Sequence, residues 1–360
     1  MSGYASTTTA TLFTSYGWPS DAVSLGSLSP VYSKREEEPV RSLLKALIKN
    51  HHDVFHIEHR DKPNELARVL VALHDLGATR EKIIQGYYKV IPTLVPLLHT
   101  NQKTLTITRD SWKDYLGDTQ YYRAYLAFFT DQIQDLGIES AIDSFLFDIN
   151  SPLSTSFGAQ LQPLVHMTFG LEYGMQDIVA QGLAYLASSH TDIQPLVQEY
   201  DNGHCAAHEP EHILFDMVAA DPRFDGRMET ADTVPAAIKI LLKSQASLLA
   251  TYVNTASIRS PEQLVHLAAK LLPIMQHCRS GASLLASALA IQAWASTGRN
   301  VDQLLRIQWL ATLCTYIAEN RPMPPAHSSI DIASKTSHES NDLCLWQKYP
   351  ITCQSSQVIW

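Results

Sequence analysis

Between residues 36 and 322, apolar and polar residues mostly alternate with the period of an α-helix. The clearest case is the segment 260–276, where Ser260 suits the N-cap, Pro261 the first helical position and Gln263 a capping box. The apolar positions that follow, at helical spacing, are Leu264, Leu267, Ala268, Leu271, Leu272 and Met275. This pattern predicts a helix with one buried face.

Similar apolar stripes occupy most of the middle of the chain. They run through 40–50, 63–76, 80–98, 119–136, 159–173, 176–188, 234–253, 281–296 and 301–319. Gly77, Gly117 and Gly137 stand where such helices should end. Leu105–Thr108 is the only strand candidate, and its pattern is weak. We therefore expect an all-α fold, with a single large multi-helix domain over residues 36–325.

The two ends of the chain lack this period. Residues 1–35 are rich in Ser, Thr, Gly and Pro and predict an extended N-terminal arm, while residues 326–360 predict an irregular C-terminal tail. The first residues have neither a basic start nor an apolar stretch, so we expect no secretory signal. A long uncharged stretch, between Arg279 and Arg299, contains several Ser and Thr residues. It is typical of a buried core helix rather than of a membrane span.

Charge and cysteine content narrow the classes of function. The 360 residues carry 27 basic and 36 acidic side chains, a formal charge of −9, and no dense basic run. This balance argues against a nucleic-acid partner. The five scattered cysteines form no CxxC pair and indicate thiols in a reducing compartment. We expect a cytoplasmic protein that binds small molecules and neither nucleic acid nor membrane. The oligomeric state is left open.

Common catalytic signatures are missing, and histidines are the main remaining source of chemistry. The chain has no GxGxxG after a strand, no GxxxxGK[ST] and no GxSxG. Without a βαβ pattern, a Rossmann cofactor site is not expected. His51, His52, His56 and His59 gather at the end of the first predicted helix. For His51 and His52, a ligand role and a cation at a helix C-terminus are equally good explanations.

A second histidine group has the spacing of metal ligands. His204, His208 and His212 are four residues apart, with Cys205 and Glu211 between them. Imidazole and thiolate at this spacing would bind zinc or iron on a continuous helix. A glycine and a proline interrupt the segment, however, so we expect a solvated loop rather than a metal site.

His166 belongs to a helical face that mixes polar and aromatic groups. Gln162, His166, Phe169 and Tyr173 fall at i, i+4, i+7 and i+11. Buried polar groups need hydrogen-bond partners, so this face should meet other polar groups or a ligand. A core histidine that is bonded within the protein is the alternative.

Further candidate site residues lie on three other predicted helices. They are Glu65, Arg68, Ser283, Ser287, Trp294 and Gln308. Gln308 lies within the inward stripe of its helix, and the two serines share a side of their helix with Trp294. Glu65 and Arg68 are three residues apart, which also suits an ordinary exposed ion pair.

Five sequence segments, taken in their order along the chain, resemble the pattern of a known family. They are PNELARVLVALHDLGAT (63–79), W-x3-LG-x4-Y-x2-YLAFF (112–129), PLVHMTFGLEY (163–173), SLLASALA (283–290) and LLRIQWLATLCTYIA (304–318). This ordered set resembles the questin oxidase-like proteins of fungal secondary metabolism. The resemblance implies an all-helical fold and tailoring of polyketide-derived aromatics. Some members of that family resemble non-haem iron enzymes, with several histidine ligands and a modified lysine.

The family pattern is altered where ligands are expected. Its histidine-rich stretch is replaced around Asn64, the first histidine of HPLIH is Gln162, and the lysine after LLxW is Gln308. The piece HLLTS begins here with Ser283 and ends with a second serine. Only His166 of that ligand set survives, and one imidazole is too few for a catalytic iron. We infer that the metal was lost and the pocket kept, so we expect no metal and no other cofactor.

A metal-free pocket on this fold is similar to that of the fungal hetero-Diels–Alderases of tropolonic sesquiterpene biosynthesis. These enzymes join a tropolone-derived o-quinone methide to a humulene-type olefin. The resemblance assigns His166 as the general acid, with Arg68 offsetting enolate charge and Glu65 holding Arg68. The expected substrate-binding residues are Asn64, Gln162, Phe169, Tyr173, Ser283, Ser287, Trp294 and Gln308.

Two other classes of function remain open. One is an iron oxygenase or Baeyer–Villiger-type oxidoreductase acting on a polyketide-derived aromatic, with His51, His52 and His166 or the His204–His212 group as ligands. The other is a non-catalytic helical binding protein. Stoichiometric iron and oxygen consumption would support the first, and a solid core around His166 would support the second.

Overall fold

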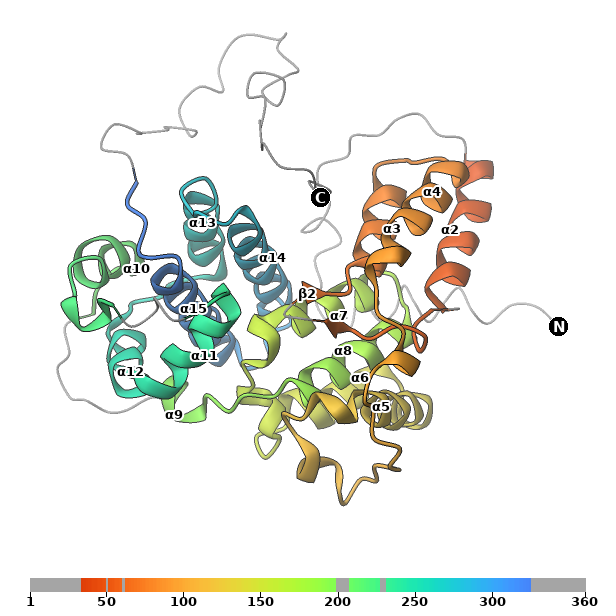
Figure 1. Cartoon of the computed structure of the whole chain (residues 1–360), viewed down its shortest axis with the longest axis horizontal. Coiled ribbons are helices and arrows are strands. Elements are labelled where there is room, and N and C mark those ends of the chain that lie inside the picture. Colours follow the sequence, from red (N-terminus) through yellow and green to blue (C-terminus); the bar gives the residue numbers. More distant parts are fainter. Residues whose placement is uncertain (1–33, 50, 60–61, 199–206, 227–230, 325–360) are drawn as a thin grey trace, which may run out of the picture. The chain divides into compact units, whose positions relative to one another are not determined.

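Helices make up nearly all the regular structure, and the fold is all-α, as predicted (Figure 1). The computed structural model describes residues 34–49, 51–59, 62–198, 207–226 and 231–324. Most of the predicted arm and the whole predicted tail therefore lie outside the described residues, and the domain boundaries stay predictions. The described residues up to Met323 belong to one compact unit.

The element order follows the apolar stripes of the sequence. The α-helices are α2 (Lys34–Lys49), α3 (Leu66–Asp75), α4 (Arg80–Val90), α5 (Tyr122–Leu136), α6 (Ile138–Ile142), α7 (Gln162–Glu172), α8 (Gln176–Ser188), α9 (Gln194–Val197), α10 (Pro210–His212), α11 (Val234–Ser244), α12 (Ala246–Thr255), α13 (Pro261–Leu271), α14 (Cys278–Ala295) and α15 (Val301–Ala318). The 3-10 turns are η1 (Ile91–Thr93), η2 (Leu97–His99), η3 (Trp112–Tyr115), η4 (Thr119–Tyr121), η6 (Pro152–Thr155), η7 (Gly158–Leu161) and η9 (Pro222–Phe224), and the π-helical turns are η5 (Asp143–Phe147) and η8 (Ile213–Val218).

The only strands in the described part of the chain are β1 (Glu58–His59) and β2 (Lys62–Pro63), which pair antiparallel. The strand candidate Leu105–Thr108 was wrong, because that segment has no regular structure. Two predicted helices are also shorter than expected. Helix α4 ends before Pro92, since proline lacks a backbone N–H and favours a turn, and Gln245 separates α11 from α12 by leaving helical geometry.

The start of α13 confirms the predicted cap only in part. Ser260 is the N-cap residue and Pro261 occupies the first turn, but the Ser260 side chain makes no capping bond. The Gln263 side chain instead accepts a hydrogen bond of 2.9 Å from the backbone N–H of Arg259, one residue earlier than a capping box requires. The predicted box is therefore not formed.

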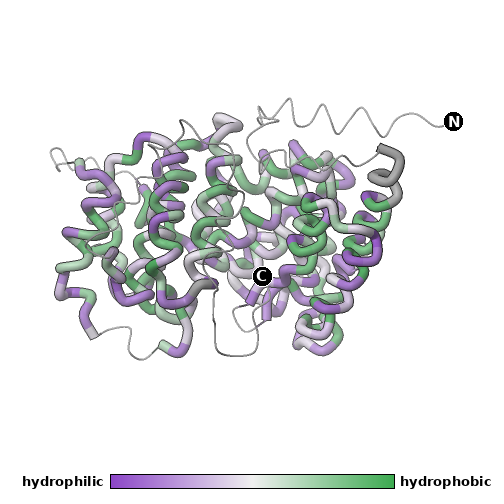
Figure 2. The backbone as a smooth tube through the Cα atoms, turned by 90° about the horizontal axis from the view of Figure 1, so that it is seen from above, coloured by the Kyte–Doolittle hydropathy of each residue, from purple (hydrophilic) through white to green (hydrophobic). Residues whose placement is uncertain are grey.

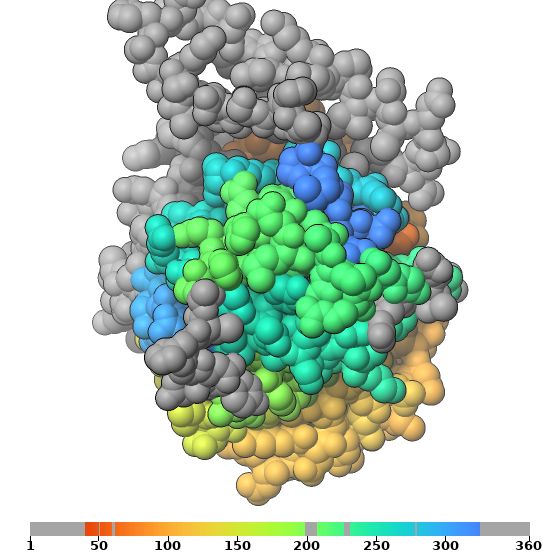
Figure 3. Space-filling view, turned by 90° about the vertical axis from the view of Figure 1, so that its left-hand side faces the viewer, coloured from red at the N-terminus to blue at the C-terminus, as the bar shows by residue number. Residues whose placement is uncertain are grey.

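The main core surrounds α7 and α8, which are buried on nearly every side. Helix α8 packs against α5 and α7, α7 also packs against α14, and α14 packs against α13 and α15. Green and purple segments alternate along most of the other helices, as amphipathic helices require (Figure 2). The segments of α10 to α12 form the outer surface on the face shown in Figure 3.

A second, smaller core joins α2, α3 and α4, which lie together in Figure 1. Leu44, Leu70 and Ile83 are completely buried there, and Phe169 and Tyr173 of the α7 region pack against the cluster. The face of α7 that was singled out in the sequence thus meets this helical cluster. No helix in the described ranges combines the length and apolar character needed to cross a membrane.

Glycines allow α7 and α8 to approach closely. A Cβ atom on Gly170 would lie 2.8 Å from Val179 Cγ2 and 2.9 Å from the Val179 backbone nitrogen. A Cβ on Gly182 would collide with the Met167 side chain. The backbone contact at Gly170 leaves no room for relaxation, so this position sets the distance between the two helices.

We expect Gly170→Ala to lower the free energy of unfolding by about 1–3 kcal/mol, because the added methyl group forces two packed helices apart. Chemical denaturation followed by circular dichroism measures this change. Gly86→Ala is the matched control, since its Cβ would meet only the movable end of the Leu73 side chain, at 2.5 Å. Equal stability of the two variants would contradict close backbone packing at Gly170.

Candidate active site

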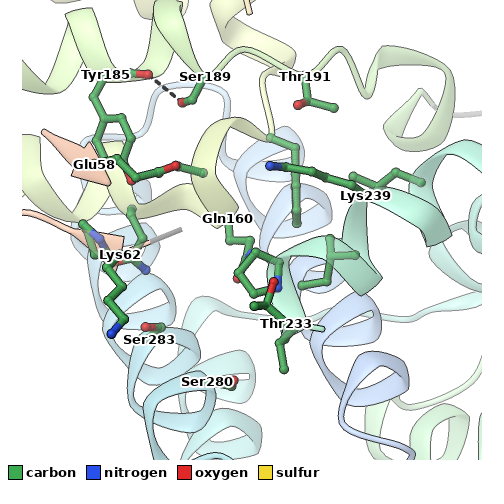
Figure 4. A pocket seen from close by; sticks show the side chains of 18 of the residues that line it. Glu58, Lys62, Gln160, Tyr185, Ser189, Thr191, Thr233, Lys239, Ser280 and Ser283 are labelled. Carbon is green, nitrogen blue, oxygen red and sulfur yellow. Dashed lines mark hydrogen bonds between the residues drawn. The ribbon is translucent and has the colours of Figure 1, made fainter. Parts of the chain in front are cut away.

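A pocket of about 460 Å³ lies among the β1–β2 hairpin, η7, the ends of α7 and α8, α11 and the start of α14. This volume falls in the range of small-molecule sites. In Figure 4, Glu58 and Lys62 stand on one side, Thr233 and Lys239 on the other, and Gln160 between them. Ser280 and Ser283 come from the first turns of α14. Chain segments far apart in sequence therefore converge on one cavity.

The lining combines apolar residues with charged and titratable ones. The apolar residues include Phe157, Ala159, Val234, Pro235, Ile238 and Leu242. The charged and titratable residues are Glu58, Lys62, Tyr185, His190, Asp232, Lys239, His277 and Arg279. Such a lining would hold a mainly apolar ligand and orient its few oxygen atoms.

A strained turn places two glutamines at the pocket. Ala159, Gln160 and Leu161 have φ values of 42°, 54° and 65°, so three successive non-glycine residues are left-handed. Each costs roughly 1–2 kcal/mol relative to ordinary helical geometry. Preceding Gly158 is packed so closely that a Cβ would lie 2.7 Å from Ser189 Oγ. The turn brings Gln160 into the lining and starts α7 with Gln162 at the pocket. Backbone strain of this kind is characteristic of functional sites.

Arg68 lies behind Gln162 and is held by it. Arg68 Nη1 donates to Gln162 Oε1 at 2.7 Å, and Nη2 donates to the Gln162 carbonyl at 3.2 Å. Arg68 Nε and Gln162 Nε2 are buried and have no partner in the described part of the chain. Burial lowers the pKa of Arg68, but guanidinium groups remain charged in proteins. A buried cation therefore rests on a neutral amide that lines the pocket.

His166 lies one turn further along α7, beside a much smaller cavity. That cavity, of about 20 Å³, is lined in part by His51, His52, Asn64, His166 and Gln181. His166 Nε2 bonds to Gln181 Oε1 at 2.8 Å, and Gln181 in turn donates to the His52 carbonyl at 2.7 Å. Burial, followed by the charge of Arg68, lowers the pKa of His166 to about 4. The imidazole is therefore neutral near pH 7 and does not line the larger pocket. Its role as an acid stays a prediction.

Tyr185 and Glu58 form a polar pair in the wall of the larger pocket. The Tyr185 hydroxyl donates to Glu58 Oε2. Burial and the nearby Glu58 carboxylate raise the pKa of Tyr185 well above its usual value, although Arg68 opposes the shift. The phenol is therefore held in its protonated form. Sequence reasoning missed this pair because its members are far apart in the chain and Tyr185 continues an apolar stripe.

The other predicted acidic and amide residues are dispersed. Glu65 accepts a hydrogen bond of 2.9 Å from pocket-lining Arg279, and no direct bond joins it to Arg68 in the described residues. Asn64 Oδ1 accepts from the backbone N–H of Leu66 at 3.0 Å, as a local turn would. Gln308 is completely buried, and neither of its amide atoms has a described partner.

The remaining predicted substrate-binding residues divide between the pocket and the cores. Ser283 lines the pocket, whereas Ser287 is buried and donates to Leu284 within its own helix at 2.9 Å. Trp294 is buried, with its Nε1 donor 3.4 Å from the Leu164 carbonyl. Phe169 packs against both cores, and the Tyr173 hydroxyl donates to Asp75. Of all the predicted site residues, Gln162 and Ser283 are those that line the larger pocket.

The histidine groups occupy sites of different kinds. His204 and Cys205 lie outside the described residues. His212 Nδ1 bonds to Asp216 at 2.7 Å on the surface, and Glu211 pairs with Lys270. His51 bonds to the Tyr87 hydroxyl, and His52 Nδ1 bonds to the Lys49 carbonyl at 2.8 Å.

The residues around His166 do not fit an iron centre. In the described part of the chain, no three His, Cys, Asp or Glu side chains are grouped so that they could hold a metal ion. The Gln162 amide oxygen already accepts from Arg68, and the Arg68 charge acts on His166. A metal cation at these donors would be repelled by the guanidinium group. We therefore derive no chemical step through a metal.

Comparison with known proteins identifies the family. The questin oxidase-like family model matches residues 63–348. The chain belongs to the questin oxidase-like family. Its relatives include the Baeyer-Villiger monooxygenase AacuH of Aspergillus aculeatus, which is 26% identical over 45% of this chain and 36% of its own length. The Baeyer-Villiger oxidase ptaJ of Pestalotiopsis fici is 24% identical over 42% of this chain and 36% of its own.

A questin oxidase of Aspergillus terreus is 25% identical over 39% of this chain and 34% of its own length. These matches span little more than a third of the relatives they cover. The relatives are enzymes of an oxidoreductase type by name. The family confirms the resemblance inferred from the ordered sequence pieces.

Because the pKa of His166 is lowered, we expect the free energy of unfolding to depend on pH. Between pH 6.5 and pH 4 the unfolded chain would bind a proton that the folded imidazole does not, so the folded state should lose stability as the pH falls through this window. The contribution of this one group is at most about 3 kcal/mol. We expect His166→Gln to flatten the dependence, measured by urea denaturation at several pH values. Exposed His99→Gln is the control, and parallel profiles for the His166 variant and wild type would contradict a neutral His166.

Proposed function

We propose that the chain is a hetero-Diels–Alderase that works without a metal. It would dehydrate a hydroxymethyl tropolone to an o-quinone methide and add this species to a humulene-type olefin. The observation that carries the proposal is the buried Arg68 guanidinium, which rests on the neutral amide of pocket-lining Gln162. A buried cation without a carboxylate bonded to it favours an anionic oxygen nearby. The acidic oxygen of a tropolone has this character.

The chemistry needs two things that the pocket supplies. Dehydration removes a hydroxyl group from the side carbon and a proton from the ring oxygen, so water leaves and the ring oxygen must be steadied as its electrons reorganise. Gln162, with Arg68 behind it, would orient that oxygen. The cycloaddition then forms one C–O and one C–C bond without net charge. Confinement of both reactants in a reactive pose would accelerate this step.

The apolar part of the lining suits the hydrocarbon reactant. Four of its residues, Val234, Pro235, Ile238 and Leu242, lie on α11. Apolar side chains would hold the olefin and exclude water, which otherwise captures a quinone methide. The cavity would thus offer apolar contacts to one reactant and polar contacts to the other.

Baeyer–Villiger-type oxidation of a polyketide-derived aromatic is the second candidate, because named relatives carry that description. The two candidates differ in their demand for oxygen. The donor set around His166 favours the first.

The decisive reaction test uses the purified chain with an isolated hydroxymethyl tropolone and a humulene-type alcohol, with and without chelator. We expect an adduct with the mass of both reactants less one water, formed at equal rates in both conditions and without oxygen consumption. Mass spectrometry and an oxygen electrode make the two measurements. Activity that needs iron and consumes oxygen would establish the second candidate, and no turnover of either kind would leave a binding protein.

A charge substitution tests the anionic-oxygen site separately. Gln162→Glu is nearly isosteric and would pair with Arg68, so the fold should be retained while a negative charge is placed directly on the guanidinium group. We expect affinity for an unreactive tropolone without the hydroxymethyl group to fall tenfold or more, measured by calorimetry. Gln176→Glu, on the surface at the start of α8, is the control. Unchanged affinity in the Gln162 variant would contradict this site.

A further inference from the structure

A histidine and a buried carboxylate meet at the edge of the pocket. His277 directly precedes α14 and lines the cavity, and its side chain is 65% exposed. Glu319 directly follows α15, and its side chain is 0% exposed. The two Glu319 oxygens lie 3.2 and 3.0 Å from His277 Nδ1, and one also accepts from the His277 backbone N–H at 3.2 Å. The carboxylate therefore holds both the ring and the backbone of His277.

Burial of the Glu319 carboxylate is energetically unfavourable unless the group is well hydrogen-bonded, because a charge loses its free energy of solvation when it leaves water. In the described part of the chain, every hydrogen bond to the Glu319 side chain comes from His277. The carboxylate fixes Nδ1 as the protonated nitrogen that faces the protein, and no described residue bonds Nε2. A carboxylate behind an imidazole keeps its tautomer and orientation and stabilises the ring when it carries two protons.

Tyr185, His190 and Arg279, which also line the pocket, are less suited to passing a proton. The pKa of Tyr185 is raised well above its usual value by burial and Glu58. The pKa of His190 is lowered by burial. Arg279, in the first turn of α14, bonds to Glu65. The further charged residues of the lining are Glu58, Lys62, Asp232 and Lys239.

We propose that His277 is the acid–base residue of this pocket and that Glu319 is its positioning residue, an inference that rests on the proposed function. With its ring doubly protonated beside the Glu319 carboxylate, His277 donates the Nε2 proton to the leaving hydroxyl group as the C–O bond breaks, and water departs. The ring hydroxyl of the tropolone loses its own proton, which returns to Nε2. One proton is given and one is taken, so the reaction is a net loss of water and the imidazolium is restored.

The test compares two leaving groups. His277→Gln should slow turnover of the hydroxymethyl tropolone about a hundredfold or more, because general acid catalysis is lost. It should slow the acetate ester of the same substrate less than about tenfold, since acetate leaves without a proton. His212→Gln removes a surface histidine that also bonds to a carboxylate, Asp216, and should leave both rates unchanged. Glu319→Gln should lower kcat on the alcohol and keep KM.

Each result decides the inference. Equal effects of His277→Gln on alcohol and ester, or no effect on either, would overturn the acid role while the proposed function stands. If the wild-type chain turns over neither substrate, the proposed function fails and the acid role fails with it. Nitrogen-15 NMR, with His277→Gln for assignment, supplies a readout that does not depend on activity. The neutral ring should carry its proton on Nδ1, and a proton on Nε2 would overturn the role of Glu319.

Discussion

The candidate site is organised around a buried positive charge that is stabilised by a neutral amide. Arg68 has lost most of its water and receives in exchange the side-chain oxygen and the carbonyl of Gln162. This contact joins α3 to the first turn of α7 and influences His166 one turn later, whose pKa it helps to lower. The same contact occupies the side-chain oxygen of Gln162, which is therefore not free for a metal. The Arg68 charge, the position of α7 and the polarity of the pocket lining at Gln162 therefore depend on one contact.

Helix α7 connects the Arg68–Gln162 contact to the rest of the fold through its packing. It is packed against α8 at Gly170 and Gly182, against α14, and against the small core of α2 to α4. Its first turn is approached through the left-handed residues of η7. Close packing on every side keeps the strained turn in place, since an isolated turn of this kind would relax. The rigidity of the centre thus supports the geometry of the pocket edge.

The helices were predictable because each depends on a local period that the sequence displays directly. Breaks at Pro92 and Gln245 were missed because a stripe of apolar residues continues across them. The candidate site was predictable only in part. Gln162 was found from its place on a mixed helical face, but His277 and Glu319 are brought together by tertiary packing and have no common local pattern. The helical period of the sequence is local and cannot indicate a contact between residues 42 positions apart.

The way the pocket is lined has a consequence for how its shape could vary. Four of its apolar residues, Val234, Pro235, Ile238 and Leu242, lie on one helix, α11, whereas the contact between Gln162 and Arg68 joins α7 to α3. Substitutions at these apolar positions would reshape the cavity without disturbing the amide and guanidinium contact. The space offered to a ligand and the polar contacts that orient it can therefore change independently.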